Sequence, residues 1–467
     1  MPKLFAFGFG LLLAVPAWPQ TDNPPRWEPV PALVGVDHSA AAENTPNDND
    51  HPGDRMQTPP PASGQTYPTA PLSEERSNYL RYGFSFTSAY TDNVLGASNA
   101  SPVSDMSYSI APNAELDVTT SRLHWTANYA PGFTFYQRTS ARNEADHRAL
   151  IDFQYRLSPH VTISARDTFG KSSNVFNQAD LASGGVSGGT QVTNSSALAP
   201  FADQLNNSGY AGLTYQFALN GMIGANGTFT NLHYSNPEQV PGLSDSSSQS
   251  GSAFYSLRAA QAHYFGVIYQ YQRLLASPNQ STSETQTHAA LLFYTFLPSK
   301  HFSMSMFGGP QHSDTVQPTL SSSLGQLPEL RTWTPAAGAS LSFQGRQTAL
   351  VLTYSHMIAP GSGLLGAVRM DSGTVSLRRQ ITRTLSGLFA GGFAQNEYVG
   401  SSVLGNNGHS IVGTASVQRQ FGERLNIQLG YTRLHQVYSG VAVLSAAPDT
   451  DRGFVSISYQ FSRPLGR

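Results

Sequence analysis

Cysteine is absent from the 467 residues, so the chain has no disulfide framework, thiol nucleophile, iron–sulfur cluster, cysteine-based zinc site or lipidated N-terminal cysteine. Charge is scarce, because only 12% of residues are charged, against about 25% in a typical soluble domain. The formal net charge of −2 gives no general attraction to nucleic acid. Beyond the N-terminal region there is no run of about 18 apolar residues, which excludes helices that span a membrane.

The first 17 residues have the features of a secretory signal peptide. Lys3 supplies the positive end and Leu4 to Val15 the apolar run, followed by a small-residue site with cleavage after Ala17. The apolar run is too short to span a membrane. The alternative is an N-terminal anchor or a buried helix. The sequence therefore predicts an exported protein.

Residues 18–78 differ in composition from the rest of the chain. Eleven prolines lie between Pro24 and Pro71, among Asn, Asp, Ser and Thr. Such a segment cannot bury enough surface to offset chain entropy, so we expect a disordered periplasmic arm. The arm contains a group of acidic residues with a histidine: Asp48, Asp50, His51 and Asp54. Their spacing fits no closed set of metal ligands, and a solvated acidic run is the preferred interpretation.

The stretch that begins at Ala149 alternates between apolar and polar residues. One side carries Ala149, Ile151, Phe153, Tyr155 and Leu157, and the other carries Leu150, Asp152, Gln154 and Arg156. A short turn at 158–160 follows, and the alternation resumes over 161–166. Side chains of a strand point alternately to two faces. Two such strands of roughly ten residues, joined by a tight turn, predict a hairpin that crosses an outer membrane.

The same unit recurs over residues 79–461. Short polar turns alternate with longer connections rich in Ser, Gly and Asn, of which 171–206 is the longest. This pattern predicts an all-β fold, a transmembrane antiparallel up-and-down β-barrel of about 18 strands (16–18, since alternation is blurred at 289–296 and 335–343). An even count places both chain ends on one side, which we expect to be the periplasm. The alternative is a large soluble β-sandwich or propeller, which the aromatic strand ends and the polar opposite faces disfavour.

Charged residues on the polar faces are the candidates for a channel lining. The alternation points these side chains inward: Arg81, Asp105, Glu115, His124, Arg148, Asp152, Arg156, Arg166, Arg258 and Arg378, with Asp117 and Arg122 near the rim. Rings of arginine favour the passage of anions, so the hypothesis is a slightly cationic lumen with weak anion preference. The alternative is that these charges pair across neighbouring strands and hold the shape of the barrel.

Catalysis within the barrel has one candidate, His124, which is close in sequence to Asp117. No GxSxG elbow and no HExxH helix accompanies it. A histidine in a polar lumen needs no catalytic role, so the sequence predicts that the protein is not an enzyme and holds no cofactor or metal.

Two other features of the connections suggest roles. The loop at 171–206 could fold inward on its Gly184-Gly185 and Gly188-Gly189 pairs, although a mobile surface loop is the preferred interpretation. Basic residues lie at or beside the short turns: Arg122, Lys300, Arg346, Arg379, Arg383, Arg419 and Arg424. They could reach lipid phosphates of the inner leaflet, so outer-membrane lipids are expected partners. Ordinary turn polarity is the alternative.

The segment Tyr90-Thr91-Asp92-Asn93-Val94, after the first strand, resembles a signature of a family of outer-membrane β-barrel porins. Residues 124–169 are similar to the same family. Its members often lie with exopolysaccharide or exosortase systems, so the resemblance implies a barrel and a polysaccharide context. Such barrels commonly end on an aromatic residue read by the barrel-assembly machinery. Here Phe461 is followed by a tail, 462–467, which leaves that signal internal.

The function that these features predict is an outer-membrane channel for passive passage of small hydrophilic solutes. The alternative is a structural or accessory barrel of exopolysaccharide export or of cell-envelope assembly, with polysaccharide as the partner and the arm docking a periplasmic protein. The two differ in whether the barrel conducts ions.

Overall fold

The computed structural model of the chain describes residues 78–94, 102–172, 203–235, 244–277, 283–299, 301–316, 330–361, 366–399, 407–422, 424–439 and 449–464. Several sequence-based expectations lie outside these described residues: the signal peptide (1–17), the arm as far as residue 77, its acidic group, the glycine pairs at 184–189, Lys300 and the tail beyond residue 464. In the part that is described, no helix is long and apolar enough to cross a membrane.

The described residues form eighteen β-strands and one short 3-10 helix. In chain order these are β1 (Tyr79–Thr91), β2 (Asp105–Thr119), β3 (Leu123–Tyr136), η1 (Ser140–Arg142), β4 (Glu144–Arg156), β5 (Val161–Ser172), β6 (Gln204–Ala218), β7 (Gly221–Tyr234), β8 (Ser246–Ala260), β9 (His263–Ala276), β10 (Ser283–Ser299), β11 (Phe302–Val316), β12 (Leu330–Gln344), β13 (Thr348–Pro360), β14 (Ala367–Gln380), β15 (Leu385–Tyr398), β16 (Gly408–Phe421), β17 (Leu425–Tyr438) and β18 (Asp449–Pro464).

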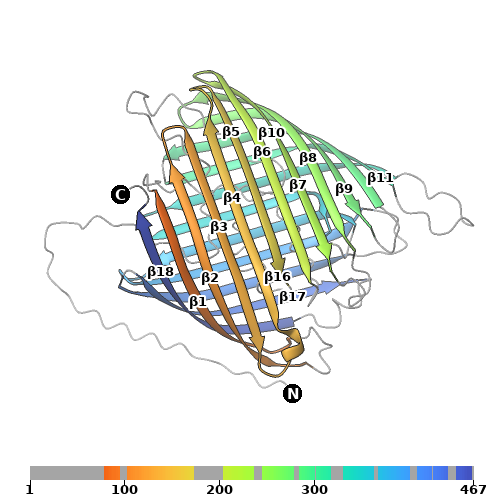
Figure 1. Cartoon of the computed structure of the whole chain (residues 1–467). Helices are drawn as coiled ribbons and strands as arrows, with labels where there is room; N and C mark the ends of the chain where they lie inside the picture. Colours follow the sequence, from red (N-terminus) through yellow and green to blue (C-terminus); the bar gives the residue numbers. More distant parts are fainter. Residues whose placement is uncertain are drawn as a thin grey trace, which may run out of the picture. The chain divides into compact units, whose positions relative to one another are not determined.

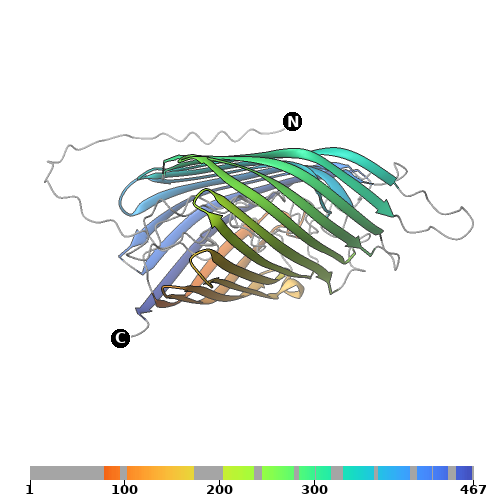
Figure 2. The same cartoon turned by 90° about the horizontal axis from the view of Figure 1, so that it is seen from above.

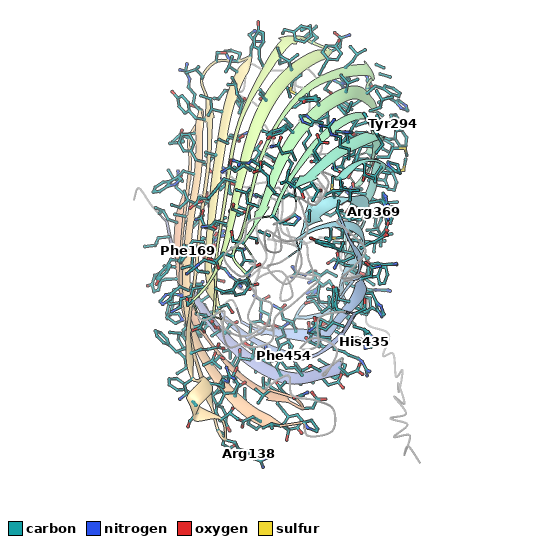
Figure 3. All side chains as sticks on the ribbon, turned by 90° about the vertical axis from the view of Figure 1, so that its right-hand side faces the viewer. Arg138, Phe169, Tyr294, Arg369, His435 and Phe454 are labelled. Carbon is teal, nitrogen blue, oxygen red and sulfur yellow. The ribbon has the colours of Figure 1, made fainter. Side chains whose placement is uncertain are left out.

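Every strand pairs in antiparallel fashion with the strands before and after it in the chain, and β1 pairs with both β2 and β18. The sheet is therefore closed, and the prediction of an antiparallel up-and-down barrel of 18 strands is confirmed. The strands are strongly tilted, so that those at the front and back of the barrel cross in projection (Figures 1 and 2). Seen from the side in Figure 3, they form a closed ring.

The two ends of the barrel differ in their connections. We call the end with the short connections the turn end and the opposite end the loop end. Tyr79 lies opposite Pro464 in the β1–β18 register, so the described strands begin and finish together at the turn end. The backbone of β18 runs three residues past Phe461, whose ring stacks on Tyr82 with centroids 5.0 Å apart. This contact closes the ring between the first and last strands.

Serine and threonine side chains shape the short turns. In three of them a hydroxyl accepts a hydrogen bond from the backbone N–H that starts the next strand: Thr120 from Leu123 (3.0 Å), Ser158 from Val161 (3.1 Å) and Thr382 from Leu385 (3.1 Å). Ser and Thr favour such turns because they bond their own backbone a few residues on. A two-to-four-residue reversal fixes the register of each hairpin, so these hydroxyls help to decide which side chains point inward.

The outer face of the barrel is apolar. Along β1, Tyr82, Phe84 and Phe86 are 40–50% exposed, while Arg81 and Ser85, at the alternate positions, point inward. The same alternation recurs around the ring, and in Figure 3 Phe169 and Tyr294 point away from it, whereas Phe454 lies on its inner side. A continuous exposed band of large apolar side chains is what a lipid-facing surface requires.

The expected alternation is blurred at 289–296 for a physical reason. Ala289, Leu291 and Phe293 point inward and are buried, while Leu292 points outward and is 67% exposed. Both faces of β10 are therefore apolar, which hides the period of two. The inner side of this part of the wall is not polar, and the expectation of a polar inner face is wrong here.

Candidate functional site

Charged side chains on the inner face gather on one part of the wall. The strand alternation places thirteen of them inside: Arg81 (β1), Asp105, Glu115 and Asp117 (β2), Glu144, Asp146, Arg148, Asp152 and Arg156 (β4), Arg166 (β5), Arg258 (β8), Arg378 (β14) and Arg452 (β18). Ten of them lie on β1–β5. In the described parts of β6, β7, β9–β13 and β15–β17, no charged residue occupies an inward position. Ions inside the barrel therefore meet charge mainly along β1–β5.

Two pairs of opposite charge form between neighbouring strands on this wall. Arg81 Nη1 lies 3.3 Å from Glu115 Oε1, and the register places the two residues directly opposite each other. Arg166 binds Asp152 through its guanidinium, again at directly opposite positions of β5 and β4. Directly opposed charges of opposite sign stabilise antiparallel pairs. Each pair also weakens the field that its members would exert on a passing ion.

Asp105, another candidate for the lining, has a structural role. Its carboxylate accepts hydrogen bonds from the backbone N–H groups of Arg138 and Thr139 (3.1 and 2.8 Å) and from the Thr139 hydroxyl (2.7 Å). The side chain sits at the loop end of β2 and only 3% of Asp105 is exposed. It holds the connection from β3 to β4 in place rather than facing a solute path.

We expect Asp105→Ala to lower the stability of the barrel by about 2 kcal/mol, because the part-buried N–H donors of Arg138 and Thr139 lose their acceptor. Ion selectivity should stay unchanged. Urea unfolding in lipid vesicles and reversal potentials in planar bilayers measure the two properties. Unchanged stability with a shifted reversal potential would contradict the structural role.

Arg258 and Arg378 lie near the turn end. Arg258 is the last inward residue before the β8–β9 turn, where its Nη2 donates to the Gln261 carbonyl (3.3 Å) and its guanidinium lies 5.9 Å from the centre of the Tyr264 ring. Arg378 is two residues from the end of β14, opposite Ala349 and Leu388 of the flanking strands. Both therefore belong to the rim rather than to the middle of the wall.

Strands β4 and β5 of the charged wall carry three inward arginines, which we call the β4–β5 arginine group: Arg148, Arg156 and Arg166, of which Arg156 is the last residue of β4 at the turn end. Arg148 and Arg156 stand on the same face of β4, roughly 26 Å apart along the strand. Asp152 lies between them and carries the ion pair with Arg166. The inward face of β4 and β5 also carries Glu144 and Asp146, so over its whole length three positive charges meet three negative ones. From Arg148 to the turn end, however, the arginines outnumber the acids by three to one.

Sequence reasoning missed Arg452. It points inward from β18 opposite Thr91 of β1, is 9% exposed, and has Tyr136, Glu144 and Asp146 as electrostatic partners on β3 and β4. Buried charge of this kind is retained where opposite charge surrounds it. The predicted last strand begins at residue 455, so the alternation does not extend to Arg452. In the structure β18 begins at Asp449, and Arg452 points to the same side as Phe454.

The inner face of β7–β13 holds a group that we call the interior apolar cluster. Its members are Met222, Phe254, Tyr264, Ile268, Ala289, Leu291, Phe293, Phe307, Ala336 and Met357. Glycines on adjacent strands make room for the rings: a Cβ on Gly266 would collide with the Phe293 ring, and one on Gly338 with the Phe307 ring. Side chains therefore fill this part of the barrel, where the sequence led us to expect a polar lining.

The two outer rims differ in charge. At the turn end, arginines lie over aromatic rings, with Arg419 4.9 Å from the centre of Phe421 and Arg424 6.0 Å from that of Phe461. At the loop end, basic side chains pair with acidic ones, and His356 Nδ1 lies 2.7 Å from Asp371. The other pairs are Arg369–Glu397, Arg433–Asp449 and His435–Asp449. Arg369 and His435 are labelled in Figure 3. Arginine over an aromatic ring suits an interface with anionic headgroups.

His124, the single catalytic candidate, points inward with its Nε2 3.4 Å from Asp117 Oδ1. Asp117 also accepts a hydrogen bond from the Thr119 hydroxyl (3.4 Å). Among the described residues no cluster of His, Asp and Glu is arranged to hold a metal ion. An imidazole beside a carboxylate near the turn end of the wall adds one more polar pair to the lining.

Comparison with known proteins finds no family model that matches the sequence. No curated protein matches it either. Among solved structures the chain is similar to OccAB4 from Acinetobacter baumannii (7% identity, TM-score 0.38, 83% of this chain and 99% of that one). It is also similar to the outer membrane protein OpdK from Pseudomonas aeruginosa (10%, 0.39, 82% and 99%) and to the alcaligin outer-membrane receptor FauA from Bordetella pertussis (10%, 0.38, 84% and 77%). These identities are too low to transfer a function to this chain.

Proposed function

We propose that this protein is an outer-membrane channel through which small hydrophilic solutes pass passively. The observation that carries the proposal is the contrast between the two faces of one closed sheet, apolar outside and polar inside along β1–β6. A closed barrel satisfies its backbone hydrogen bonds without an open edge, which is what a bilayer demands of a spanning sheet. The proposal includes no catalysis.

The proposed orientation puts the turn end in the periplasm. Short turns on that side and long loops outside are the usual asymmetry of such barrels. The arginines over Phe421 and Phe461 support it, because they would meet the anionic lipids of the inner leaflet. The aromatic closing strand β18 is the proposed contact of the barrel-assembly machinery, and the arm would then lie in the periplasm.

Purified protein in planar bilayers tests the channel directly. We expect discrete open-channel steps and uptake of small sugars into vesicles that contain the protein. A barrel that inserts but never conducts would refute the proposal.

Weak anion preference is the finer proposal, and it rests on the β4–β5 arginine group. Under a salt gradient we expect a reversal potential of the sign that chloride permeation gives. Replacing Arg148 and Arg156 together by Gln should lower the ratio of chloride to potassium permeability by about twofold, because rings and clusters of arginine favour anions. Arg379→Gln, on the outer face at the turn end, is the matched control and should change nothing. Cation preference of the unmodified protein would contradict this proposal.

A second candidate is a structural or accessory barrel of exopolysaccharide export or of the cell envelope. The interior apolar cluster favours it, because side chains fill the barrel next to β7–β13. A barrel of this kind gives no open-channel steps, and its loss would impair polysaccharide export or envelope integrity in the cell. The planar-bilayer experiment therefore separates the two candidates.

A further inference from the structure

Strands β12 and β13 are paired over only part of their length. Their register runs from Gln344 opposite Ala349, at the turn end, to Ala337 opposite His356. Beyond that point β12 continues over 330–336 paired with β11 alone, and β13 continues over 357–360 paired with β14 alone. The wall therefore divides in its loop-end half, and the two strands take different paths.

Prolines account for the division. Pro335 of β12 lies directly opposite Pro310 of β11. Neither residue has an N–H, so this must be a non-hydrogen-bonded pair, and the backbone groups of Pro335 point toward the β13 side. If the pairing of β12 with β13 continued, Ile358 would lie opposite Pro335. The Ile358 carbonyl would then have no hydrogen-bond donor, because Pro335 has no N–H. Pro360, two residues further on, removes the next donor from β13. Both edges are thus built not to pair with each other.

The loop-end part of β13 lies inside the barrel. The Ile358 N–H donates to the side-chain oxygen of Gln311 on β11 (3.2 Å), which replaces the backbone acceptor that β12 would have supplied. Ile358 also packs with Leu274 of β9 and with Ala367 of β14. Leu274 points inward from a strand four positions away around the ring, so this contact crosses the interior.

Burial supports the same placement. Three successive residues of β13, Met357, Ile358 and Ala359, are 4%, 2% and 7% exposed. In a one-layer wall successive side chains alternate between the lumen and the lipid, so both faces cannot be covered unless the strand has left the wall. Val368, on the paired part of β14, is 0% exposed. We call Met357–Pro360 together with Ala367 and Val368 the inner tip.

We propose that the inner tip is the built-in constriction of the channel, and that Gln311 is the residue that pins it. This rests on the proposed channel function. The tip occupies the side of the lumen next to β8–β11, which confines hydrated solutes to the side lined by the β4–β5 arginine group. Gln311 is uncharged and only 2% exposed, and its side-chain oxygen accepts the hydrogen bond from the Ile358 N–H. We therefore assign it the role of holding the inner tip in place.

The test uses the absence of cysteine from the chain. Gln311→Ala removes the pin and should raise the unit conductance roughly twofold or more, because a wider water-filled cross-section conducts more. Ile358→Ser, which removes the apolar contact with Leu274, is the second variant and should act in the same direction. A short bis-maleimide linking Leu274→Cys to Ile358→Cys should return the Gln311→Ala variant to the conductance of the unmodified protein.

A matched control links Ser340→Cys to Thr353→Cys, which lie directly opposite each other in the paired part of β12 and β13. This link should leave conductance unchanged. Equal conductance of the unmodified, Gln311→Ala and Ile358→Ser proteins overturns the constriction but leaves the channel standing. No conductance from any of them overturns the channel function itself. Conductance that appears only in the two variants supports the inner tip as the obstruction, but it shows that the tip closes the unmodified barrel and so overturns passive passage through it.

Discussion

Arginine in place of Leu429, on the outer face of β17, is expected to destabilise the folded barrel by about 2–4 kcal/mol. Leu429 is 62% exposed and lies between Ile427 and Tyr431 on the same face. At this position, four residues into β17 from the turn end, the guanidinium would sit in the apolar band of the bilayer. Urea unfolding in lipid vesicles, followed by tryptophan fluorescence, measures the change.

The adjacent residue provides the control. Gln428 points inward, where its amide donates to the Ser416 hydroxyl (3.0 Å). Gln428→Arg gives up that hydrogen bond, which costs about 1 kcal/mol, but keeps the charge in a polar environment. Equal losses for the two variants would mean that the outer face of β17 does not meet lipid, and the membrane placement would then be wrong.

The strand count and the direction of most side chains could be predicted because both follow from a period of two along the chain. The stretch 149–166 shows why: each polar residue of β4 and β5 that the pattern placed inward is inward in the structure. Alternation is local, and the short turns that join the strands are local too. Neither the alternation nor the turns depend on contacts between residues that are distant in the sequence.

The pairing of inward charges could not be predicted in the same way. Alternation places Arg81 and Glu115 on one face, but only the register of β1 against β2 sets them opposite each other. That register depends on how the long connection 92–104 is accommodated. The role of Asp105 could not be predicted for the same reason. Its carboxylate accepts hydrogen bonds from the backbone of Arg138 and Thr139, whose position relative to β2 is set by the three-dimensional fold.

The interior apolar cluster and the inner tip are still harder to predict from the sequence. An apolar run such as 289–294 reads equally well as a strand buried on both faces and as a poorly alternating one. Pro335 and Pro360 are ordinary edge prolines when taken singly. Their meaning appears only when Pro310 is found opposite Pro335 and Gln311 is found holding Ile358, which are contacts between strands far apart in the chain.

Alanine at Gly309 is expected to give the other large effect, a loss of about 3 kcal/mol or more of folding free energy, as overpacking in a rigid site does. Gly309 lies on β11 where the ladder with β10 is interrupted over two residues of each strand, Ala290 and Leu291 facing Gly309 and Pro310. A Cβ there would meet the carbonyl oxygen of Ala290 well inside van der Waals contact, and would lie 3.0 Å from the Leu291 Cα. These are backbone atoms of the neighbouring strand, so no side-chain rotation can relieve the contact.

Gly413→Ala on β16 is the matched control, because no atom lies within 4 Å of the Cβ it would add. This change should be neutral or stabilise by up to about 1 kcal/mol, since glycine in a strand loses the most conformational entropy on folding. Gel mobility of heated and unheated samples reports the folded fraction of each variant, and urea unfolding gives its free energy. If Gly309→Ala is as stable as Gly413→Ala, β10 and β11 do not approach so closely. Leu291 and Phe293 would then have space behind them, and the interior apolar cluster would not be a filled part of the barrel.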